Sequence, residues 1–374
     1  MVDKTPNAVG RVLLFSDLHI HPHKRKTERL EDCLKVLEWV FDTAIERGIE
    51  NILFGGDLFH DRQKIDVLTY QRTFEIFDKK ISEWRKGNGE AKIWLLLGNH
   101  DLWHLKKHDV SSVYPLAAID GVEIISEPCT RTICSNSEGE EFQVSFLPYT
   151  HNPPEDLGKI ENKSENKVLV GHIAIDNAVW NRLHGTRSEV SIEHDGDMIK
   201  VDTKIFDGWN QVFLGHYHAE QQLDFNTEYI GSPLQLSFGE AFQHKHIVQF
   251  DLKNNDKEYI RNTFSPHHFI IPEADLEKYV LDNNFIRVLV EDISDSKTIE
   301  MRQKLTEDND VGSLEIQQSS KKKEEHIVED AKAILFKEEE MLDQYVDEVE
   351  KGSGLDTLEK EHLLEIGKNI LQSE

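Results

Sequence analysis

One pattern recurs between residues 11 and 218 of the chain: a short apolar segment runs directly into residues that can bind a metal. In residues 93–101, for example, the apolar run IWLLL precedes Gly-Asn-His-Asp. Such runs suit strands of a parallel sheet that is covered on both faces. The five sets are Asp17-Leu18-His19, Asp57 with His60, Gly98-Asn99-His100-Asp101, Gly171-His172 and Gly215-His216-Tyr217-His218. Because ligands bind at the carboxyl ends of strands in open α/β sheets, the pattern predicts one site built by five strands.

The segments between the first apolar runs favour helices. Residues 28–48 and 68–84 repeat apolar side chains at helical spacing, and Gly48 is the expected end of the first helix. Strand–helix alternation predicts an α/β sheet with helical crossovers up to about residue 250. Residues 120–150 are the exception, because their short segments indicate a run of β-structure.

The chain changes character after about residue 255. FIRVLVEDI predicts a strand, SKTIEMRQKL a helix and GSLEIQQ another strand, which together make a small α+β unit. SSKKKEEH is typical of a solvated linker, and two amphipathic helical patterns separated by KGSGLD come after it. We therefore expect a site-bearing domain at 1–255, an α+β domain at 256–318, and a linker with a helical hairpin at 319–374.

Seven of the side chains at the strand ends have metal-ligating chemistry: two carboxylates, four imidazoles and one amide oxygen. They are Asp17, His19, Asp57, Asn99, His172, His216 and His218. A nitrogen and oxygen set without thiolate suits manganese, iron or zinc. Asp57 would bridge two cations about 3.5–4 Å apart, and the pair would activate a water that attacks phosphorus in line. The sequence thus predicts two divalent metal ions.

The ordered motifs D-x-H, G-D, G-N-H-D, G-H and G-H-x-H resemble those of the calcineurin-like metallophosphoesterase superfamily, over about residues 11–250. The resemblance implies a two-sheet α/β sandwich flanked by helices. It also assigns one metal to Asp17, His19, Asp57 and His218, and the other to Asp57, Asn99, His172 and His216. It implies further that His100 meets the phosphate and protonates the leaving oxygen, oriented by Asp101. The residues agree, since a histidine beside a metal ligand is a natural general acid.

Further segments resemble the SbcD-type nucleases of double-strand-break repair. His60 lies three residues after Asp57 in GGDLFHDR, and the resemblance implies that it takes part in catalysis. YIGSPLQLSFGE (229–240) is similar to the segment that comes after the last metal motif in that family, although Gly231 and Pro233 alone would suit a tight turn. A small capping domain, a polar linker and a helical docking element match the family layout. A hairpin that packs on its own domain is the alternative for the last helices.

The resemblance implies a manganese-dependent DNA nuclease subunit, with exonuclease activity on duplex ends and endonuclease activity on single strands. It would belong to an SbcCD-like repair or recombination complex, as a homodimer whose C-terminal hairpins dock two SMC-like ATPase subunits. The chain has no G-x-x-x-x-G-K-[ST], so ATP dependence would come from that partner. Bacterial and tailed-phage members are the most similar in layout. The alternatives are a metallophosphatase acting on phosphoproteins or small phosphoesters, and a recruiting scaffold with a vestigial site.

The net charge of −27 argues against a general nucleic-acid binder, because phosphate backbones attract basic surfaces. Bound metals can supply the positive charge locally. The strongest basic cluster, Lys24, Arg25 and Lys26, comes after the first motif and is the expected DNA contact, with a solvated loop as the alternative. A second, HLKKH at 104–108, comes after the third motif. Because no segment has the apolar length of a membrane span or signal peptide, and the three cysteines are scattered, we expect a cytoplasmic protein.

Overall fold

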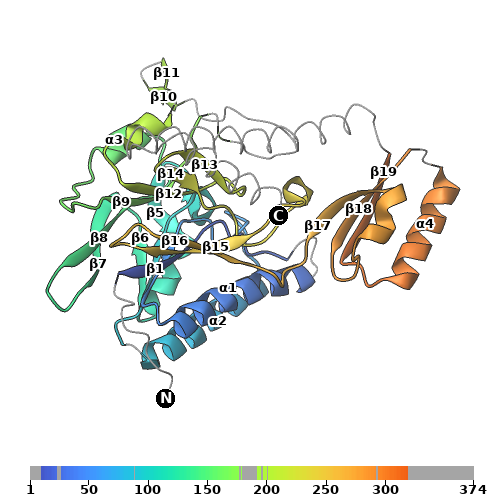
Figure 1. Ribbon diagram of the computed structural model, residues 1–374, viewed down its shortest axis with the longest axis horizontal. Helices are drawn as coiled ribbons and strands as arrows, with labels where there is room; N and C mark the ends of the chain where they lie inside the picture. The colour runs from blue at the N-terminus through green and yellow to red at the C-terminus, as the bar shows by residue number, and fades with distance from the viewer. Residues whose placement is uncertain are drawn as a thin grey trace, which may run out of the picture. The chain divides into compact units, whose positions relative to one another are not determined.

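The computed structural model of the protein describes residues 10–22, 27–87, 89–176, 178, 192–194, 197–199, 201–291 and 294–318 (Figure 1). Two of the predicted features lie outside these residues. They are the basic cluster Lys24, Arg25 and Lys26, and the linker with its helical hairpin at 319–374. In the described residues, no helix combines the length and apolar character that crossing a membrane requires.

The first of two six-stranded sheets carries the strand–helix alternation. Its order is β16 (Lys257–Arg261), β15 (His246–Asp251), β1 (Arg11–Phe15), β2 (Asn51–Phe54), β3 (Lys92–Leu96) and β6 (Val122–Ile125). The strands β1, β2, β3 and β6 are parallel, whereas β15 runs antiparallel to β1. The crossover helices are α1 (Thr27–Arg47) and α2 (Val67–Gly87), which pack together along this sheet (Figure 1). Helix α1 stops where predicted, at Gly48 with φ +64°.

The second sheet has the order β13 (Gln221–Asp224), β14 (Thr227–Tyr229), β12 (Gln211–Gly215), β9 (Val168–His172), β8 (Glu141–Leu147) and β7 (Cys129–Ser135). Its four central strands, β14, β12, β9 and β8, are parallel. The expected helical crossovers are absent from the described connections. These hold only the short helix α3 (Pro153–Leu157), the two-stranded β10 (Ile192–His194) and β11 (Asp197–Ile199), and the 3₁₀ turn η4 (Thr203–Phe206). In the part of the chain that the structure describes, the alternation of strand with long helix therefore ends near residue 100, and the prediction that it continues to 250 is wrong for these residues.

The two sheets face each other across an apolar layer. Val12 and Leu14 of β1 and Phe146 of β8 belong to one buried cluster. Leu13 and Phe15, which alternate with them along β1, join a second cluster with the apolar faces of α1 and α2. Side chains alternate between the faces of a strand, so both faces of this sheet are covered. The fold is thus a mixed α/β two-sheet sandwich with helices on the outer face of the first sheet, as expected.

Smaller elements complete the described chain. The hairpin of β4 (Leu102–His104) and β5 (Lys107–Ser111) comes after the 3₁₀ turn η2 (Asn99–Asp101), and the turn η3 (Tyr114–Ala118) leads to β6. A further 3₁₀ turn, η5 (Phe238–Glu240), lies before β15. The α+β unit has the predicted order: β17 (His268–Pro272), η6 (Glu273–Lys278), β18 (Phe285–Val290), α4 (Asp295–Asp308) and β19 (Ser313–Gln318), with sheet order β17-β18-β19.

Contacts divide the chain into two compact units. Among the described residues, the first reaches Ile270 and includes Leu281–Ile286 and Asp310–Ser313; the second holds Ile271–Val280, Arg287–Asn309 and residues 314–318. The domain boundaries expected at residues 255 and 318 stay a prediction.

Candidate metal centre

The predicted ligands gather where the carboxyl ends of strands from both sheets meet. Strands β1, β2 and β3 of the first sheet lead to Asp17 and His19, to Asp57, and to Asn99. Strands β9 and β12 of the second sheet lead to the three histidines His172, His216 and His218. A hydrogen bond of 2.9 Å from the Tyr149 N–H to the Leu97 carbonyl joins the end of β8 to the end of β3. The site therefore depends on the pairing of two sheets and not on one.

The backbone at this edge is unusual because several ligands have left-handed conformations. Positive φ angles occur at Asp17 (54°), His19 (47°), Asp57 (63°) and His216 (107°). Non-glycine residues rarely adopt this region, and such strain clusters at functional sites. The backbone at the strand ends therefore keeps a strained conformation, which directs the ligand side chains.

Glycines let the two sheets approach closely at the centre. A Cβ atom at Gly56 would lie 2.4 Å from Nδ1 of His172. One at Gly98 would lie 2.2 Å from Oδ1 of Asp57. Real side chains could not occupy these positions without moving the ligands, which explains why a glycine precedes the polar residue in these motifs.

The first cluster of ligands contains Asp17, His19 and His218. The Nε2 atoms of His19 and His218 lie 3.0 Å apart, and Nε2 of His19 is 3.9 Å from Oδ1 of Asp17. Oδ2 of Asp57 is 3.6 Å from the same nitrogen. Two imidazole nitrogens and two carboxylates therefore converge from three strands on one small volume.

The second cluster contains Asp57, His172 and His216. Nε2 of His172 lies 3.3 Å from Oδ2 of Asp57 and 3.0 Å from Oδ1 of Asn99. The same Asn99 oxygen is 3.0 Å from Nδ1 of His216. Asp57 thus lies between the two clusters, within 3.6 Å of an imidazole nitrogen in each.

Outer hydrogen bonds orient three of these ligands. Nδ1 of His172 lies 2.7 Å from the Gly55 carbonyl, which can only accept, so this nitrogen carries the proton and Nε2 offers a lone pair. The His100 N–H donates to Oδ1 of Asp57 at 2.7 Å. Nδ1 of His218 lies 3.1 Å from Oε1 of Glu240, which leaves Nε2 facing the cluster. Partners of this kind are typical of residues that bind metals.

Glu240 is itself part of a buried ion pair. Its Oε2 lies 2.7 Å from Nζ of Lys245, and the two side chains are only 7% and 5% exposed. Lys245 also donates to the His218 carbonyl at 2.8 Å and to Oγ of Ser232 at 2.9 Å. The segment 229–240 is therefore more than a turn, because it delivers the carboxylate that holds His218.

The pKa values of the buried groups in the centre shift in opposite directions. Burial alone would raise the pKa of Asp57, but His172, which also hydrogen-bonds to it, and His19 hold it well below the ordinary carboxyl value. Burial opposes protonation of His172, yet Asp57 raises its pKa to about 9. Burial and the neighbouring His172 lower the pKa of His216 to about 3. The centre thus combines anionic Asp57 with a neutral imidazole, a donor set that fits divalent cations.

His60 and His100 lie beside the first cluster. The His100 ring centroid is 4.8 Å from that of His19 and 5.8 Å from that of His60. Nδ1 of His100 lies 2.5 Å from the His60 carbonyl, so Nε2 is left for another partner. His60 is exposed and His100 half-buried, so both rings can be reached from solvent.

Asp101 does not orient His100 as the resemblance implied. Its Oδ2 accepts from the N–H groups of Asp57 (2.8 Å) and Gly98 (2.9 Å), and its Oδ1 accepts from that of Leu58 (3.0 Å). The buried carboxylate therefore ties the loop after β2 to the loop after β3. The partner of the His100 ring is instead the His60 carbonyl, which contacts Nδ1.

Three functional side chains were not singled out from the sequence: Glu240, Tyr149 and Arg62. The Tyr149 ring centroid is 6.3 Å from that of His216 and 6.5 Å from that of His172. Burial raises the pKa of its hydroxyl, whereas nearby Arg62 lowers it. Nε of Arg62 is buried and has no hydrogen-bond partner among the described residues. The segments GGDLFHDR and FLPYT contain Arg62 and Tyr149, and YIGSPLQLSFGE contains Glu240, but nothing local marks these residues as neighbours of the ligands.

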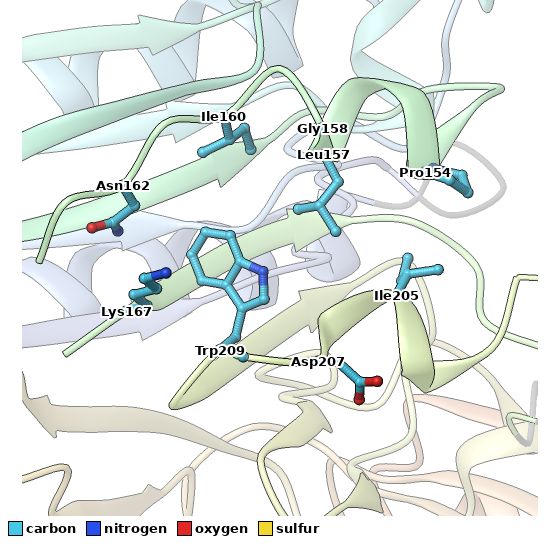
Figure 2. A pocket seen from close by; sticks show the side chains of 10 residues that line it. Pro154, Leu157, Gly158, Ile160, Asn162, Lys167, Ile205, Asp207 and Trp209 are labelled. Carbon is cyan, nitrogen blue, oxygen red and sulfur yellow. The ribbon is translucent and has the colours of Figure 1, made fainter. Parts of the chain in front are cut away.

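A hollow of about 410 Å³ lies away from the metal ligands (Figure 2). Leu157, Ile160, Ile205 and Trp209 form its apolar wall, and Lys167 lies at its edge (Figure 2). Lys167 and Trp209 precede β9 and β12, whereas the ligands come at the far ends of the same strands. The hollow is therefore at the opposite edge of the second sheet and has no part in the metal chemistry.

Comparison with known proteins gives one family and several curated relatives. The family profile for calcineurin-like phosphoesterases matches residues 10–260. A nuclease SbcCD subunit of Staphylococcus saprophyticus is 25% identical over 74% of this chain and 72% of its own. The "Exonuclease subunit 1" of Enterobacteria phage T4 is 24% identical over 68% of each chain. The corresponding nuclease SbcCD subunit of Bacillus subtilis is 25% identical over 66% of this chain and 67% of its own.

The matched residues contain both sheets and every ligand of the two clusters. The donor set also agrees with the divalent metals that such enzymes use. The chain belongs to the calcineurin-like phosphoesterase family and is a metal-dependent phosphoesterase.

Proposed function

We propose that this protein is a manganese-dependent DNA nuclease subunit of an SbcCD-like repair or recombination complex, with duplex exonuclease and single-strand endonuclease activity. Three relatives from bacteria and a phage have names that describe nuclease or exonuclease subunits. The observation that carries the proposal is the pair of ligand clusters on either side of Asp57, with the rings of His100 and His60 beside them.

The residues divide naturally between two cations. Asp17, His19 and His218 would hold one, Asn99, His172 and His216 the other, and Asp57 would bridge them. When bound, such a pair supplies activation of a water nucleophile and stabilisation of negative charge on the phosphate. The nitrogen and oxygen donors, without thiolate, suit manganese, iron or zinc, and the resemblance to SbcD-type nucleases selects manganese among them.

The surrounding side chains supply the rest of the chemistry. His100 keeps Nδ1–H on the His60 carbonyl, so Nε2 is free of that contact, and in the imidazolium form the ring gives its Nε2 proton to the leaving oxygen. Its neighbour His60 takes part in the same step. Asp101 keeps the two loops in register through three backbone N–H groups. The unpaired Nε of Arg62 is suited to an anionic substrate, because guanidinium groups bind phosphate strongly.

The proposal also covers the domains of the chain and its assembly with partners. Residues 1–255 form the nuclease domain, 256–318 the capping domain, and 319–374 a linker and hairpin that dock an SMC-like ATPase. The nuclease subunit forms a homodimer within a heterotetramer in the cytoplasm, and Lys24, Arg25 and Lys26 contact the DNA backbone. Truncation after residue 318 tests the docking: metal binding should remain, whereas co-purification with the ATPase should be lost.

One assay separates the nuclease from a metallophosphatase. Purified protein with Mn²⁺ is given end-labelled linear duplex, circular single-stranded DNA and p-nitrophenyl phosphate, and Asp57→Ala is the matched control. We expect cleavage of both DNA substrates, little release of nitrophenol, and no activity in the control. Rapid hydrolysis of the monoester with intact DNA would identify a phosphatase. Inactivity on every substrate despite two bound metals would favour a scaffold.

A further inference from the structure

The β4–β5 hairpin begins directly after the residues that line the metal centre. Leu102 comes next after Asp101 and is fully buried, and it pairs with Ser111 across the hairpin. The register then shifts, because the next pair is His104 with Lys107. Trp103 of β4 is therefore opposite three residues of β5, those between Lys107 and Ser111. Such bulges twist a strand and re-aim its side chains, and they are common beside active sites.

The hairpin is anchored at its base and is not a loose loop. The Ser112 N–H donates to the Asp101 carbonyl at 3.0 Å. Both ring nitrogens of His108 reach backbone carbonyls, Nδ1 that of Ser126 at 2.5 Å and Nε2 that of Tyr149 at 2.9 Å. These bonds join β5 to the ends of β6 and β8, so the hairpin keeps a fixed position at the edge where the ligands gather.

Trp103 projects from this anchored base into solvent. Its side chain is 43% exposed, although tryptophan is one of the side chains with most to gain from burial. Its ring contact is an edge-on approach of 5.9 Å to the His104 ring. An indole that is exposed and held by an anchored hairpin can act as a platform for a flat ligand.

The charge around the indole is locally basic in a chain of net charge −27. Lys106 and Lys107 at the turn are exposed, and neither forms an ion pair within the described part of the chain. Asp109 is the hairpin's single acidic residue. Exposed cations beside an open aromatic ring are the combination that binds single-stranded nucleic acid, through phosphate neutralisation and base stacking.

We propose that Trp103 stacks on an unpaired nucleobase of the substrate strand, while Lys106 and Lys107 neutralise its phosphates. The inference rests on the proposed nuclease function and names the part of the substrate that this hairpin recognises. Trp103 comes four positions after Asn99, so their Cα atoms lie at most about 14 Å apart. The stacked base therefore lies within a few nucleotides of the scissile phosphate. Trp103 is thus a positioning residue that favours frayed ends and single strands.

Binding is measured first, in EDTA so that no hydrolysis occurs. A thymidine oligonucleotide is titrated into the wild type and into Trp103→Phe and Trp103→Ala while tryptophan fluorescence is recorded. Stacking contributes about 1–3 kcal/mol per base, so Trp103→Ala should weaken binding by roughly 5- to 150-fold, with Trp103→Phe in between. The wild-type fluorescence quench should disappear in both variants, because the proposal assigns the stacking to the Trp103 indole.

The matched control is Phe225→Ala. Phe225 is 83% exposed in the turn between β13 and β14, at the edge of the second sheet opposite the ligands. Its loss should leave oligonucleotide binding unchanged. Changing Lys106 and Lys107 together to alanine should flatten the dependence of binding on salt. Hydrolysis of bis(p-nitrophenyl) phosphate, which has no base to stack, should be equal in the wild type and Trp103→Ala.

Each outcome decides the inference. It is overturned if Trp103→Ala binds the oligonucleotide as tightly as the wild type, or if Phe225→Ala weakens binding equally. It is also overturned if Trp103→Ala loses activity on the small diester, because the indole would then support the centre itself. If the wild type binds the oligonucleotide through Trp103 but cuts no DNA with Mn²⁺, the stacking site stands and the nuclease proposal fails.

Discussion

Glu240→Gln tests whether the buried ion pair holds the metal ligand His218. The substitution keeps the shape of the side chain and an oxygen for Nδ1 of His218, but removes the negative charge. In the wild type, burial would raise the pKa of Glu240, yet Lys245 and His218 hold it well below the ordinary carboxyl value. The carboxylate therefore stays charged and favours a well-oriented His218 ring.

Two separate losses are expected from Glu240→Gln. Residues that orient metal ligands typically contribute 10- to 100-fold in metal affinity, and because an acceptor oxygen remains we expect about tenfold. The second loss is in the free energy of unfolding, because Lys245, 5% exposed, is left without its counter-charge. Breaking a buried pair costs about 3–5 kcal/mol, and the lower end applies because Lys245 keeps hydrogen bonds to the His218 carbonyl and Ser232.

The double variant Glu240→Gln with Lys245→Met separates the two effects. Removing both charges should restore most of the stability, measured by urea unfolding in EDTA, but not the metal affinity, measured by calorimetric titration with Mn²⁺. The titration contains an internal control, because the site built on His172 has no contact with Glu240 and should keep its affinity. The reasoning is refuted if Glu240→Gln binds two Mn²⁺ ions as tightly as the wild type, or if the double variant recovers full affinity.

Three further predictions rest on the geometry. Gly98→Ala should abolish activity and release at least one metal, because its Cβ would lie 2.2 Å from Oδ1 of Asp57. The control is Gly89→Ala, whose Cβ would have no atom within 4 Å; it should match the wild type in metal analysis and turnover. His100→Ala should keep its metals and lose roughly 100-fold or more in rate, as for a general acid; a large loss of metal would make it a ligand instead. Burial lowers the pKa of His246 to about 4 from about 6.5 in the unfolded chain, so the unfolded state binds the proton first and stability falls as the pH drops from 6.5 to 4. His246→Gln should flatten that fall by up to about 3 kcal/mol in unfolding experiments, and an unchanged pH profile would contradict the assignment.

The ligands were predictable because each motif is local. An apolar run that ends in Gly-Asn-His-Asp predicts both the strand and the polar residues at its end. The five strands end within two residues of the expected positions. The end of α1 at Gly48 was predictable for the same reason, since a positive φ is a property of one residue. The resemblance then supplied the sandwich, which no local pattern contains.

The predicted alternation of strand and helix failed beyond residue 100 for a physical reason. Apolar periodicity reports that a strand is buried on both faces, but either helices or a second sheet can cover it. The strands β9 and β12 are buried against the first sheet on one side and against short turns and loops on the other. Strands covered by helices and strands covered by a second sheet have equally apolar sequences, so the sequence does not distinguish the two arrangements.

The role of Asp101 shows the same limit at the scale of one side chain. Its place next to His100 suggested that it orients that ring, yet its carboxylate accepts from backbone N–H groups more than 40 residues away. The Glu240–His218 contact spans 22 residues and is equally invisible in the sequence. Orientation depends on where neighbouring loops pass, and this is set by the packing of whole strands.

The sequence by itself therefore determined the ligand types, their order and the strands that carry them, because these are properties of short segments. Only the tertiary structure decided which of the site's strands belong to which sheet, and which side chains orient the ligands. It also showed that Trp103 stays exposed beside the centre. The physical reason is that coordination and orientation require contacts between segments far apart in the chain, and these exist only once the two sheets have packed together.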